Sequence, residues 1–324
     1  MQTHLKSSEV DMFTKLAIIF VILQLSSGIP LETTQDAQVA QIAQTAQVQT
    51  SEKAKSAYDV TSFFSSRIVG GVDAPKGFAP YMVALITGDV IKFFVCGGSI
   101  ISKHHVLTAA HCIDPFVHWG ELSESFTGLA GSNYWNATYV VIKFCGYRNH
   151  PDWDWATIKN DIGILITTVE ISFTVRVRPI TLNFDWVGGG EKGYVAGWGR
   201  LGAWENIPYW LQLLLVKILS PKECHERMLQ AAGAGVIAPP VDPKIEMCTF
   251  AGLGSGMCNG DSGSALVKIL RQQHGHVIYE EHVQVGIVSW GIPCARGVPD
   301  VFVRVSGYKS FVTETLRTHN TCKR

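Results

Sequence analysis

Short runs of β-branched and aromatic residues dominate the chain from residue 68 onward, with Gly, Pro, Asn and Asp between them. The run residues favour strands and the residues between them favour turns. Many short strands punctuated in this way predict an all-β barrel or sandwich. The clearest predicted strands are 81–86, 93–101, 139–144, 162–168, 283–290 and 301–305.

The last segment has a different period. Tyr308, Phe311, Val312 and Leu316 recur at helical spacing, which predicts one amphipathic helix docked on the β-structure. Two other stretches, 231–243 and 271–281, are interpreted as loops or an extended hairpin.

The first residues have the order of a secretory signal peptide. An apolar run at 16–23 follows Lys15, precedes small residues and is too short to span a bilayer. A buried helix of a cytosolic chain is the alternative, but the polar stretch that follows offers nothing for it to pack on. We expect a signal peptide at 1–28, with Met12 as an alternative initiator, and therefore a secreted, extracellular protein.

Residues 29–67 are rich in Gln, Ala, Thr and Ser and can bury little apolar surface, so we expect a mobile pro-segment. Lys+Arg and Asp+Glu both number 27, which gives a formal charge of zero. No long-range field then selects nucleic acid or an anionic membrane, and neither is an expected partner.

An even number of cysteines, eight, follows the predicted signal, and in a secreted chain this pattern predicts four disulfides without fixing their pairing. No Cys-x-x-Cys or His-Glu-x-x-His pattern is present, and the neighbouring histidines at 104–105 and 274–276 are interpreted as solvated side chains. We expect neither a metal nor a cofactor. The cysteines are Cys96, Cys112, Cys145, Cys224, Cys248, Cys258, Cys294 and Cys322.

Three local signatures occur in a fixed order along the chain. Thr-Ala-Ala-His-Cys ends at Cys112, Asn-Asp-Ile surrounds Asp161, and Gly-Asp-Ser-Gly surrounds Ser262. A serine hydroxyl is a poor nucleophile at neutral pH, so an imidazole must take its proton, and a buried carboxylate must orient that imidazole. His111, Asp161 and Ser262 are the candidates for base, acid and nucleophile.

With Arg67-Ile68-Val69-Gly70-Gly71 ahead of them, these signatures resemble the chymotrypsin family of serine proteases from Ile68 to the C-terminus. The resemblance implies two packed six-stranded antiparallel β-barrels with a C-terminal α-helix. It implies a serine endopeptidase domain at 68–324, with His111, Asp161 and Ser262 as the catalytic triad. The backbone N–H groups of Gly260 and Ser262 would form the oxyanion hole. A homologue that keeps the fold without activity is the alternative.

The resemblance also implies a zymogen. Cleavage after Arg67 by a trypsin-like protease would free the α-ammonium of Ile68 to pair with Asp261. The family pattern pairs Cys96 with Cys112, Cys224 with Cys248, and Cys258 with Cys294. Cys145 and Cys322 remain, and either they bridge the first barrel to the terminal helix or they are free thiols. Asn136 begins a glycosylation sequon. No acidic residue occurs between residues 131 and 149, so we expect no calcium site there.

The residues expected to shape the substrate pocket are Gly256, Ser289, Trp290, Gly291 and Asp300. Trypsin-like members carry Asp six residues before the nucleophile, where this chain has Gly256, and they usually have Gly where it has Asp300. This exchange resembles the crab collagenases, or brachyurins, and implies a specificity that mixes basic (Arg, Lys) and large apolar side chains. The alternative is that Asp300 pairs with Arg296 or faces solvent, leaving a chymotrypsin-like neutral pocket.

Three functions follow in order of preference: a digestive or otherwise extracellular endopeptidase, a regulatory protease of an activation cascade, and a non-catalytic binding homologue. The pro-segment contains no cysteine, so no cysteine-linked regulatory module is expected in it. The complete triad favours an enzyme over a binding protein. The expected partners are protein or peptide substrates, the activating protease and protein protease inhibitors, and the expected state is a monomer.

Overall fold

The computed structural model describes residues 69–137, 139–235, 238–274, 277–292 and 294–318. The chain divides into Met1–Phe63 and Phe64–Arg324, and everything described belongs to the second unit. The predicted signal peptide, the pro-segment with Arg67, and Ile68 lie outside the described residues. In the described ranges, no helix is long and apolar enough to cross a membrane.

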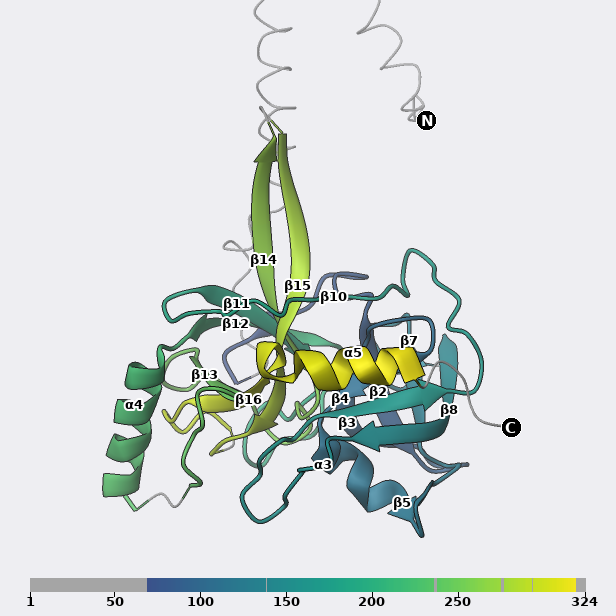
Figure 1. The fold of residues 1–324 in the computed structure, drawn as a ribbon, viewed down its shortest axis with the longest axis horizontal. Helices are drawn as coiled ribbons and strands as arrows, with labels where there is room; N and C mark the ends of the chain where they lie inside the picture. Colours follow the sequence, from purple (N-terminus) through teal and green to yellow (C-terminus); the bar gives the residue numbers. More distant parts are fainter. Residues whose placement is uncertain (1–68, 138, 236–237, 275–276, 293, 319–324) are drawn as a thin grey trace, which may run out of the picture. The chain divides into compact units, whose positions relative to one another are not determined.

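The first half of the domain is a closed antiparallel barrel in the order β2-β3-β4-β9-β8-β7 (Figure 1). Its core contains Val83, Leu85, Ile100, Leu107 and Ile164, all removed from solvent. Strands β2, β4 and β9 are buried along almost their whole length and not in alternation. Their inward side chains meet the opposite wall of the closed barrel. The strands are β2 (Met82–Thr87), β3 (Phe93–Ile100), β4 (His105–Thr108), β7 (Thr127–Ala130), β8 (Val140–Asn149) and β9 (Gly163–Thr167).

A second six-stranded ring follows the order β12-β11-β14-β15-β16-β13 and closes through the pairing of β13 with β12. Short strands β1 (Val72–Asp73) and β10 (Thr181–Leu182) extend it at β12 and β15. The prediction of two six-stranded antiparallel barrels is confirmed. The strands are β11 (Lys192–Gly197), β12 (Gln212–Ile218), β13 (Glu246–Phe250), β14 (Ala265–His274), β15 (Val277–Trp290) and β16 (Asp300–Arg304).

The predicted terminal helix is also confirmed. It is α5 (Lys309–Thr318), preceded by the 3₁₀ turn η4 (Val305–Tyr308). Tyr308 and Val312 are buried in the cluster that fills the first barrel, and Phe311 and Leu316 pack against it. The helix therefore belongs to the folded core and is not an appendage.

Helix α4 (Pro221–Gly233) was not predicted, and the stretch 231–243 taken for loop begins within its last turn. Its N-terminus is a capping box: the Ser220 hydroxyl accepts from the Glu223 N–H, while the Glu223 carboxylate accepts from the Ser220 N–H. Pro221 at the first helical position needs no hydrogen-bond partner. Ser-Pro-x-Glu is thus the sequence signal for this helix.

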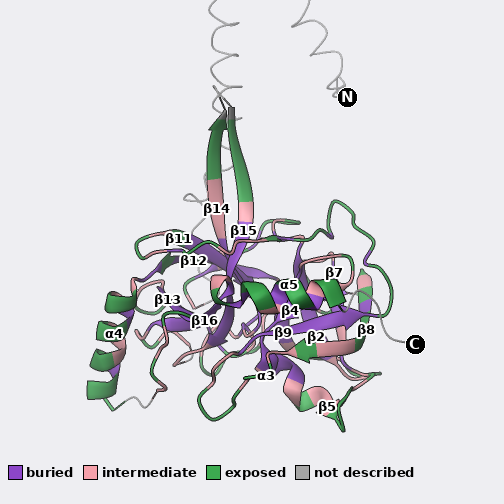
Figure 2. Cartoon of the chain, in the orientation of Figure 1, coloured by how far each residue is buried: buried purple, intermediate pink, exposed green. Residues whose placement is uncertain are grey.

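Strands β14 and β15 extend beyond the barrel as a paired ribbon, which projects from the body of the domain in Figure 1 and is increasingly exposed toward its tip in Figure 2. Their register runs from Ala265 opposite Ile287 to His274 opposite Val277. Of the interpretations of 271–281, the extended hairpin is confirmed. An ion pair of Arg271 with Glu280, 2.8 Å long, joins the strands on its exposed part.

Three of the predicted disulfides are present: Cys96–Cys112, Cys224–Cys248 and Cys258–Cys294. The first ties strand β3 to the short helix α3 (Ala110–Ile113). The fourth predicted pair includes Cys322, which lies outside the described residues, so that pairing stays a prediction.

Candidate active site

His111 lies on α3, directly after strand β4, and two of its nitrogens meet one carboxylate. The backbone N–H donates to Asp161 Oδ1 at 2.9 Å, and the ring Nδ1 lies 2.7 Å from Oδ2. Because a carboxylate oxygen accepts, Nδ1 carries the proton and Nε2 is left as the basic nitrogen. The structure therefore joins the predicted base and acid in the required tautomer.

Asp161 is 1% exposed and receives a third hydrogen bond. The hydroxyl of Ser289, on β15 of the second barrel, donates to Oδ2 at 2.6 Å. These hydrogen bonds satisfy the oxygens of a carboxylate that is almost fully removed from solvent. The sequence predicted Ser289 only as a residue of the pocket wall, whereas the structure shows a hydrogen bond from its hydroxyl to Asp161 across the two barrels.

Ser262 lies on a tight turn between Gly260 and Gly263, whose φ angles are +102° and +78°. Its carbonyl accepts from the Gly97 N–H at 2.8 Å. Gly97 adjoins Cys96, and the Cys96–Cys112 disulfide leads to the residue after His111. These links bring Ser262 and His111 to the same junction of the barrels.

The contact between the predicted nucleophile Ser262 and the predicted base His111 is not closed in this conformation. Among the hydrogen bonds of the described residues, none joins Ser262 Oγ to His111 Nε2, and Nε2 lies 3.7 Å from Cys112 Sγ. Catalytic hydrogen bonds are often long without substrate and tighten when it binds. The structure therefore shows the hydrogen bond between Asp161 and His111 that a triad requires, but not the one between His111 and Ser262.

Cys96, His111 and Cys112 place potential ligand atoms within 4.8 Å of one another. The two sulfurs are joined in a disulfide, so neither is a thiolate. A metal needs the thiolate form of cysteine. This cluster therefore fits a structural bridge beside the base and does not fit a metal centre.

Gly260 can only be glycine at its position. Its φ lies in the left-handed region, and a Cβ would come within 3.2 Å of Gly199 Cα and 3.3 Å of the Phe94 ring. Within the described ranges, no hydrogen bond uses the N–H of Gly260 or of Ser262. Both groups are thus compatible with donation to a substrate oxyanion.

Asp261 is fully buried beside Ser262, the predicted nucleophile. It accepts from the N–H groups of Gly199 at 2.8 Å and Cys258 at 3.0 Å. Burial raises the pKa of its carboxyl to about 6, although the two backbone hydrogen bonds lower it. The chain enters nearby, because the Val69 carbonyl accepts from the Gly256 N–H at 3.0 Å.

Asp300 is 5% exposed and sits between the two pocket glycines. A Cβ on Gly256 would lie 3.0 Å from Oδ2, and one on Gly291 would lie 3.4 Å from Oδ1. The Met257 N–H donates to Oδ2 at 3.0 Å. Burial first, and then the charge of Asp261, raise the pKa of Asp300 to about 7. Among the ion pairs of the described residues, none joins it to Arg296.

Trp290, the predicted pocket wall, is held by a buried ion pair that sequence reasoning missed. Its indole N–H donates to Glu246 Oε1 at 2.9 Å, and Lys159 Nζ lies 2.7 Å from Glu246 Oε2. The ammonium also lies 5.5 Å from the centre of the Trp290 ring. Lys159 is two residues before Asp161, so the pair links the acid's loop to the pocket wall.

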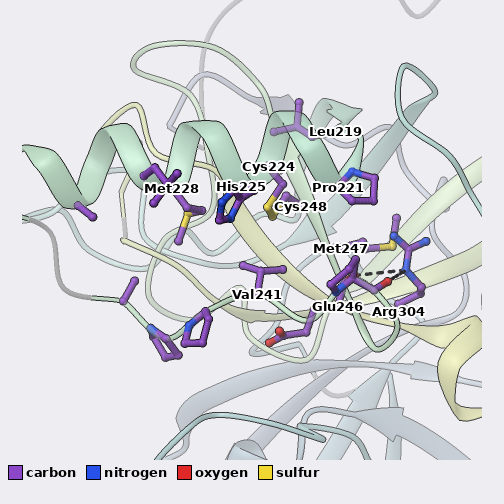
Figure 3. A pocket seen from close by; sticks show the side chains of 16 residues that line it. Leu219, Pro221, Cys224, His225, Met228, Val241, Glu246, Met247, Cys248 and Arg304 are labelled. Atoms are coloured by element: carbon purple, nitrogen blue, oxygen red, sulfur yellow. Dashed lines mark hydrogen bonds between the residues drawn. A yellow bond between two sulfur atoms is a disulfide. The ribbon is translucent and has the colours of Figure 1, made fainter.

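Glu246 also faces a separate cavity of about 380 Å³, shown in Figure 3, between α4 and the proline-rich residues 239–243. Arg304 lies at the same end of this cavity, and its guanidinium donates to the carbonyls of Pro243 and Glu246. The Cys224–Cys248 disulfide and Met228 line the apolar remainder. None of the triad residues lines this cavity.

Lys159→Met should destabilise the domain by about 3–5 kcal/mol, because it leaves a buried carboxylate without its cation. A loss of this size is expected because both side chains are largely shielded from solvent: Lys159 is 18% exposed and Glu246 is 4% exposed. Urea unfolding measures the change. Lys159→Arg is the matched control and should keep most of the stability. A loss below about 1 kcal/mol in Lys159→Met would show that solvent already screens the pair.

Comparison with known proteins agrees with this geometry. The family model described as Trypsin matches residues 68–312. Chymotrypsin-2 of Vespa crabro is 35% identical over 246 residues, covering 76% of this chain and 98% of the relative. Trypsin alpha of Drosophila erecta is 32% identical over 254 residues, covering 78% and 88%.

A vertebrate relative shows the same breadth of coverage. Trypsin II-P29 of Gallus gallus is 31% identical over 257 residues, which cover 78% of this chain and 90% of the relative. The family-model match at residues 68–312 spans both barrels and all three signature regions. The chain belongs to the trypsin-like serine protease family.

Proposed function

We propose that the protein is a secreted serine endopeptidase, made as a zymogen, that cleaves peptide bonds through an acyl-enzyme on Ser262. One observation carries the proposal: Asp161, almost fully buried, accepts hydrogen bonds from His111 N, His111 Nδ1 and Ser289 Oγ. Two of these three hydrogen bonds come from His111, so the carboxylate fixes the position of that side chain. It orients an imidazole whose other nitrogen is free to act as a base.

The reaction follows from these positions. Nε2 of His111 takes the proton of Ser262 Oγ as the oxygen bonds to the substrate carbonyl carbon, and the carbonyl oxygen becomes an oxyanion that accepts from Gly260 N and Ser262 N. The imidazolium, stabilised by Asp161, then gives its proton to the leaving amine as the peptide bond breaks. Water repeats these steps on the acyl-enzyme and restores Ser262.

The test is active-site titration of purified protein that begins at Ile68, using a fluorophosphonate probe and fluorogenic peptides. The proposal expects one probe bound at Ser262 per chain and multiple turnovers of peptide. Probe incorporation without turnover would favour the alternative of a catalytically weak binding homologue. If the probe is not incorporated and no peptide is turned over, the proposal of a serine protease is overturned.

The zymogen and secretion belong to the same proposal. A signal peptide at 1–28 and a pro-segment at 29–67 precede the domain, and cleavage between Arg67 and Ile68 by a trypsin-like protease would activate it. The hydrogen bond between Val69 and Gly256 supports an entry of the new N-terminus beside Asp261. Asn136, the proposed glycosylation site, is exposed. A regulatory cascade protease remains the alternative role.

We further propose a mixed specificity for basic and large apolar side chains, similar to that of the crab collagenases. The relatives carry both chymotrypsin and trypsin in their names, so similarity alone does not choose between the two. The support is Asp300, whose buried carboxylate lies against Gly256 and Gly291. If Asp300 stays neutral with substrate bound, the alternative is a chymotrypsin-like neutral pocket.

Asp300→Gly should remove most cleavage after Arg and Lys while sparing or improving cleavage after Phe, Tyr and Leu. Breaking one side of a desolvated charge pair costs about 2–5 kcal/mol, so basic substrates should lose roughly thirty-fold or more in kcat/KM. Peptides that differ only at the residue before the scissile bond measure the effect. A uniform loss on all of them would assign Asp300 a structural role instead.

The same carboxyl predicts a pH dependence of specificity. Its pKa is raised to about 7, so it is mainly neutral below this pH and mainly charged above it. The ratio of kcat/KM for Arg over Leu substrates should therefore rise as pH increases through about 7, and the contribution of His111 cancels in the ratio. A flat ratio in the wild type would contradict this prediction, and a flat ratio is expected for Asp300→Gly.

A further inference from the structure

Helix α4 presents one stripe of side chains to the cavity of about 380 Å³ drawn in Figure 3. The stripe follows the helical spacing i, i+3, i+4, i+7, and its residues are His225, Met228, Leu229 and Ala232. None of these side chains is fully buried, and Leu229 is 57% exposed. The helix therefore leaves a largely apolar surface open on its cavity side.

The wall across the cavity from α4 is stiff (Figure 3). It is rich in proline, a residue whose backbone φ angle is fixed, and it contains Pro239, Pro240, Val241 and Pro243. The Cys224–Cys248 disulfide also lines the cavity and ties α4 to β13. A wall fixed in this way loses little further freedom when a ligand packs on it, which lowers the cost of binding.

One end of the cavity carries a buried positive charge, Arg304, which is 2% exposed. Its Nε donates to the carbonyls of Pro243 and Glu246 at 3.0 and 3.3 Å, and its Nη1 donates to the Val187 carbonyl at 2.9 Å. The guanidinium carbon lies 3.8 Å from the centre of the Trp186 ring. In the part of the chain that the structure describes, no carboxylate forms an ion pair with Arg304 and no hydrogen bond uses its Nη2. Only neutral groups hydrogen-bond to this cation.

The carboxylate of Glu246 also lines the cavity, but its charge is already paired. It lies against the Lys159 ammonium and accepts from the Trp290 indole N–H and the Asp242 N–H. Burial lowers the pKa of Arg304 to about 10, so the guanidinium stays charged at neutral pH. A buried charge is tolerated best when an opposite charge pairs with it. The Arg304 end of the cavity is therefore complementary to an anion.

The size and chemistry of the cavity narrow the class of anion. A carboxylate is a strong acceptor for guanidinium N–H groups, and Nη2 carries two of them. An apolar cavity of about 150 Å³ holds one benzene ring, so this cavity of about 380 Å³ admits an apolar body of roughly ten carbon atoms. Met228 and Met247 in the lining are flexible and adapt to the shape of such a body.

We propose that this cavity binds a monocarboxylate with an apolar chain of roughly ten carbon atoms, its carboxylate on Arg304 and its chain between α4 and the prolines. Neither a triad residue nor Asp300 nor Gly256 lines the cavity, so this ligand and a peptide substrate occupy separate places. Glu246, which holds the Trp290 indole, separates the two. The inference goes beyond peptide hydrolysis and does not depend on it.

The test is an NMR titration of the whole chain, labelled with ¹³C at its methionine methyl groups, with decanoate. Met228 and Met247 line the cavity, whereas Met257 adjoins Asp300 through its N–H and Met82 lies in β2. Decanoate should shift the signals of Met228 and Met247 saturably, with a Kd of roughly 1 mM or tighter, and leave those of Met257 and Met82 in place. Replacement of each methionine by leucine assigns the signals.

Three headgroups on one chain length test the role of Arg304. Decanol, which is neutral, should bind at least about tenfold more weakly than decanoate, and decyltrimethylammonium should not bind. Arg304→Gln should weaken decanoate to about the affinity of decanol and leave decanol unchanged. Equal affinity of decanoate and decanol for the wild type would overturn the proposal. This comparison needs no substitution, so it decides the question even if Arg304→Gln fails to fold.

Two variants of α4 locate the ligand. Ala232→Phe fills part of the cavity and should lose saturable binding of decanoate. Lys222→Phe is the matched control and should bind as the wild type does, because the Lys222 side chain is 86% exposed and does not line the cavity. Retained binding in Ala232→Phe, or a shift confined to Met257, would contradict the proposal.

A further variant separates this inference from the proposed function. Ser262→Ala should bind decanoate as the wild type does, because Ser262 does not line the cavity. Failure of the wild type to hydrolyse peptides would contradict the proposed function and leave this inference standing. Peptide hydrolysis without saturable shifts of Met228 and Met247 would overturn the inference alone.

Discussion

Ser262→Ala should fold as the wild type does and lose several orders of magnitude in kcat, roughly 10⁶-fold if the triad acts as a unit. The variant removes one hydroxyl oxygen and leaves in place the turn held by Gly260 and Gly263. The backbone bond from Gly97 to the Ser262 carbonyl also persists, because it involves no side-chain atom. Stability should therefore change little while kcat falls steeply.

The measurement compares kcat and the urea midpoint of Ser262→Ala with those of the wild type, both beginning at Ile68. His111→Ala serves as a second variant and should lose a similar amount, and the double variant should lose little more. Residual peptide cleavage by the oxyanion hole is expected to remain well above the rate in water. Undiminished turnover in Ser262→Ala would overturn the assignment of the nucleophile.

Most of the fold was predictable from local patterns. Runs of β-branched and aromatic residues between turn residues predicted four strands within about one residue of their observed bounds, whereas Val140–Asn149 and Val277–Trp290 extend beyond the predicted 139–144 and 283–290. The spacing of Tyr308, Phe311, Val312 and Leu316 predicted the terminal helix. Helix α4 was missed because its evidence is a short capping box at Ser220 and not a long apolar stripe. The length of the β14–β15 ribbon could not be settled, since a solvated hairpin lacks a buried face.

The site was predictable where a signature fixes a residue's role and not where several distant residues cooperate. The order of His111, Asp161 and Ser262 identified the triad candidates. The direction of the Asp300 side chain could not be read from sequence, because it depends on the space left by Gly256 and Gly291. No local pattern connects Ser289 with Asp161, which lie 128 residues apart.

The two anchors of the loop before Asp161 were missed for the same reason. Glu246 and Lys159 are 87 residues apart, and Asp114 and Trp155 are 41 apart. In each pair, the two residues come into contact only when the chain between them has folded. A sequence shows the charges and the aromatic rings, but only the tertiary structure shows which of them share a hydrogen bond.

Arg67→Gln should keep the chain latent when it is treated with a trypsin-like protease, because the peptide bond before Ile68 is no longer cut. Activity should stay at least about a hundredfold below that of the processed wild type, as expected when an oxyanion hole donor is misplaced. The reason lies at Asp261, which burial holds at a pKa of about 6. An α-ammonium delivered there would favour the charged carboxylate and fix the adjoining turn with Gly260 and Ser262.

In the control, residues 63–67, Arg67 included, are replaced by a recognition sequence for an unrelated protease that cuts directly before Ile68. Cleavage of that chain should restore full activity, which separates a failure of processing from damage to the domain. Asp261→Asn, processed normally, should stay inactive, since the amide cannot form the ion pair. Full activity of uncut Arg67→Gln would remove the activation mechanism and leave the triad assignment untouched.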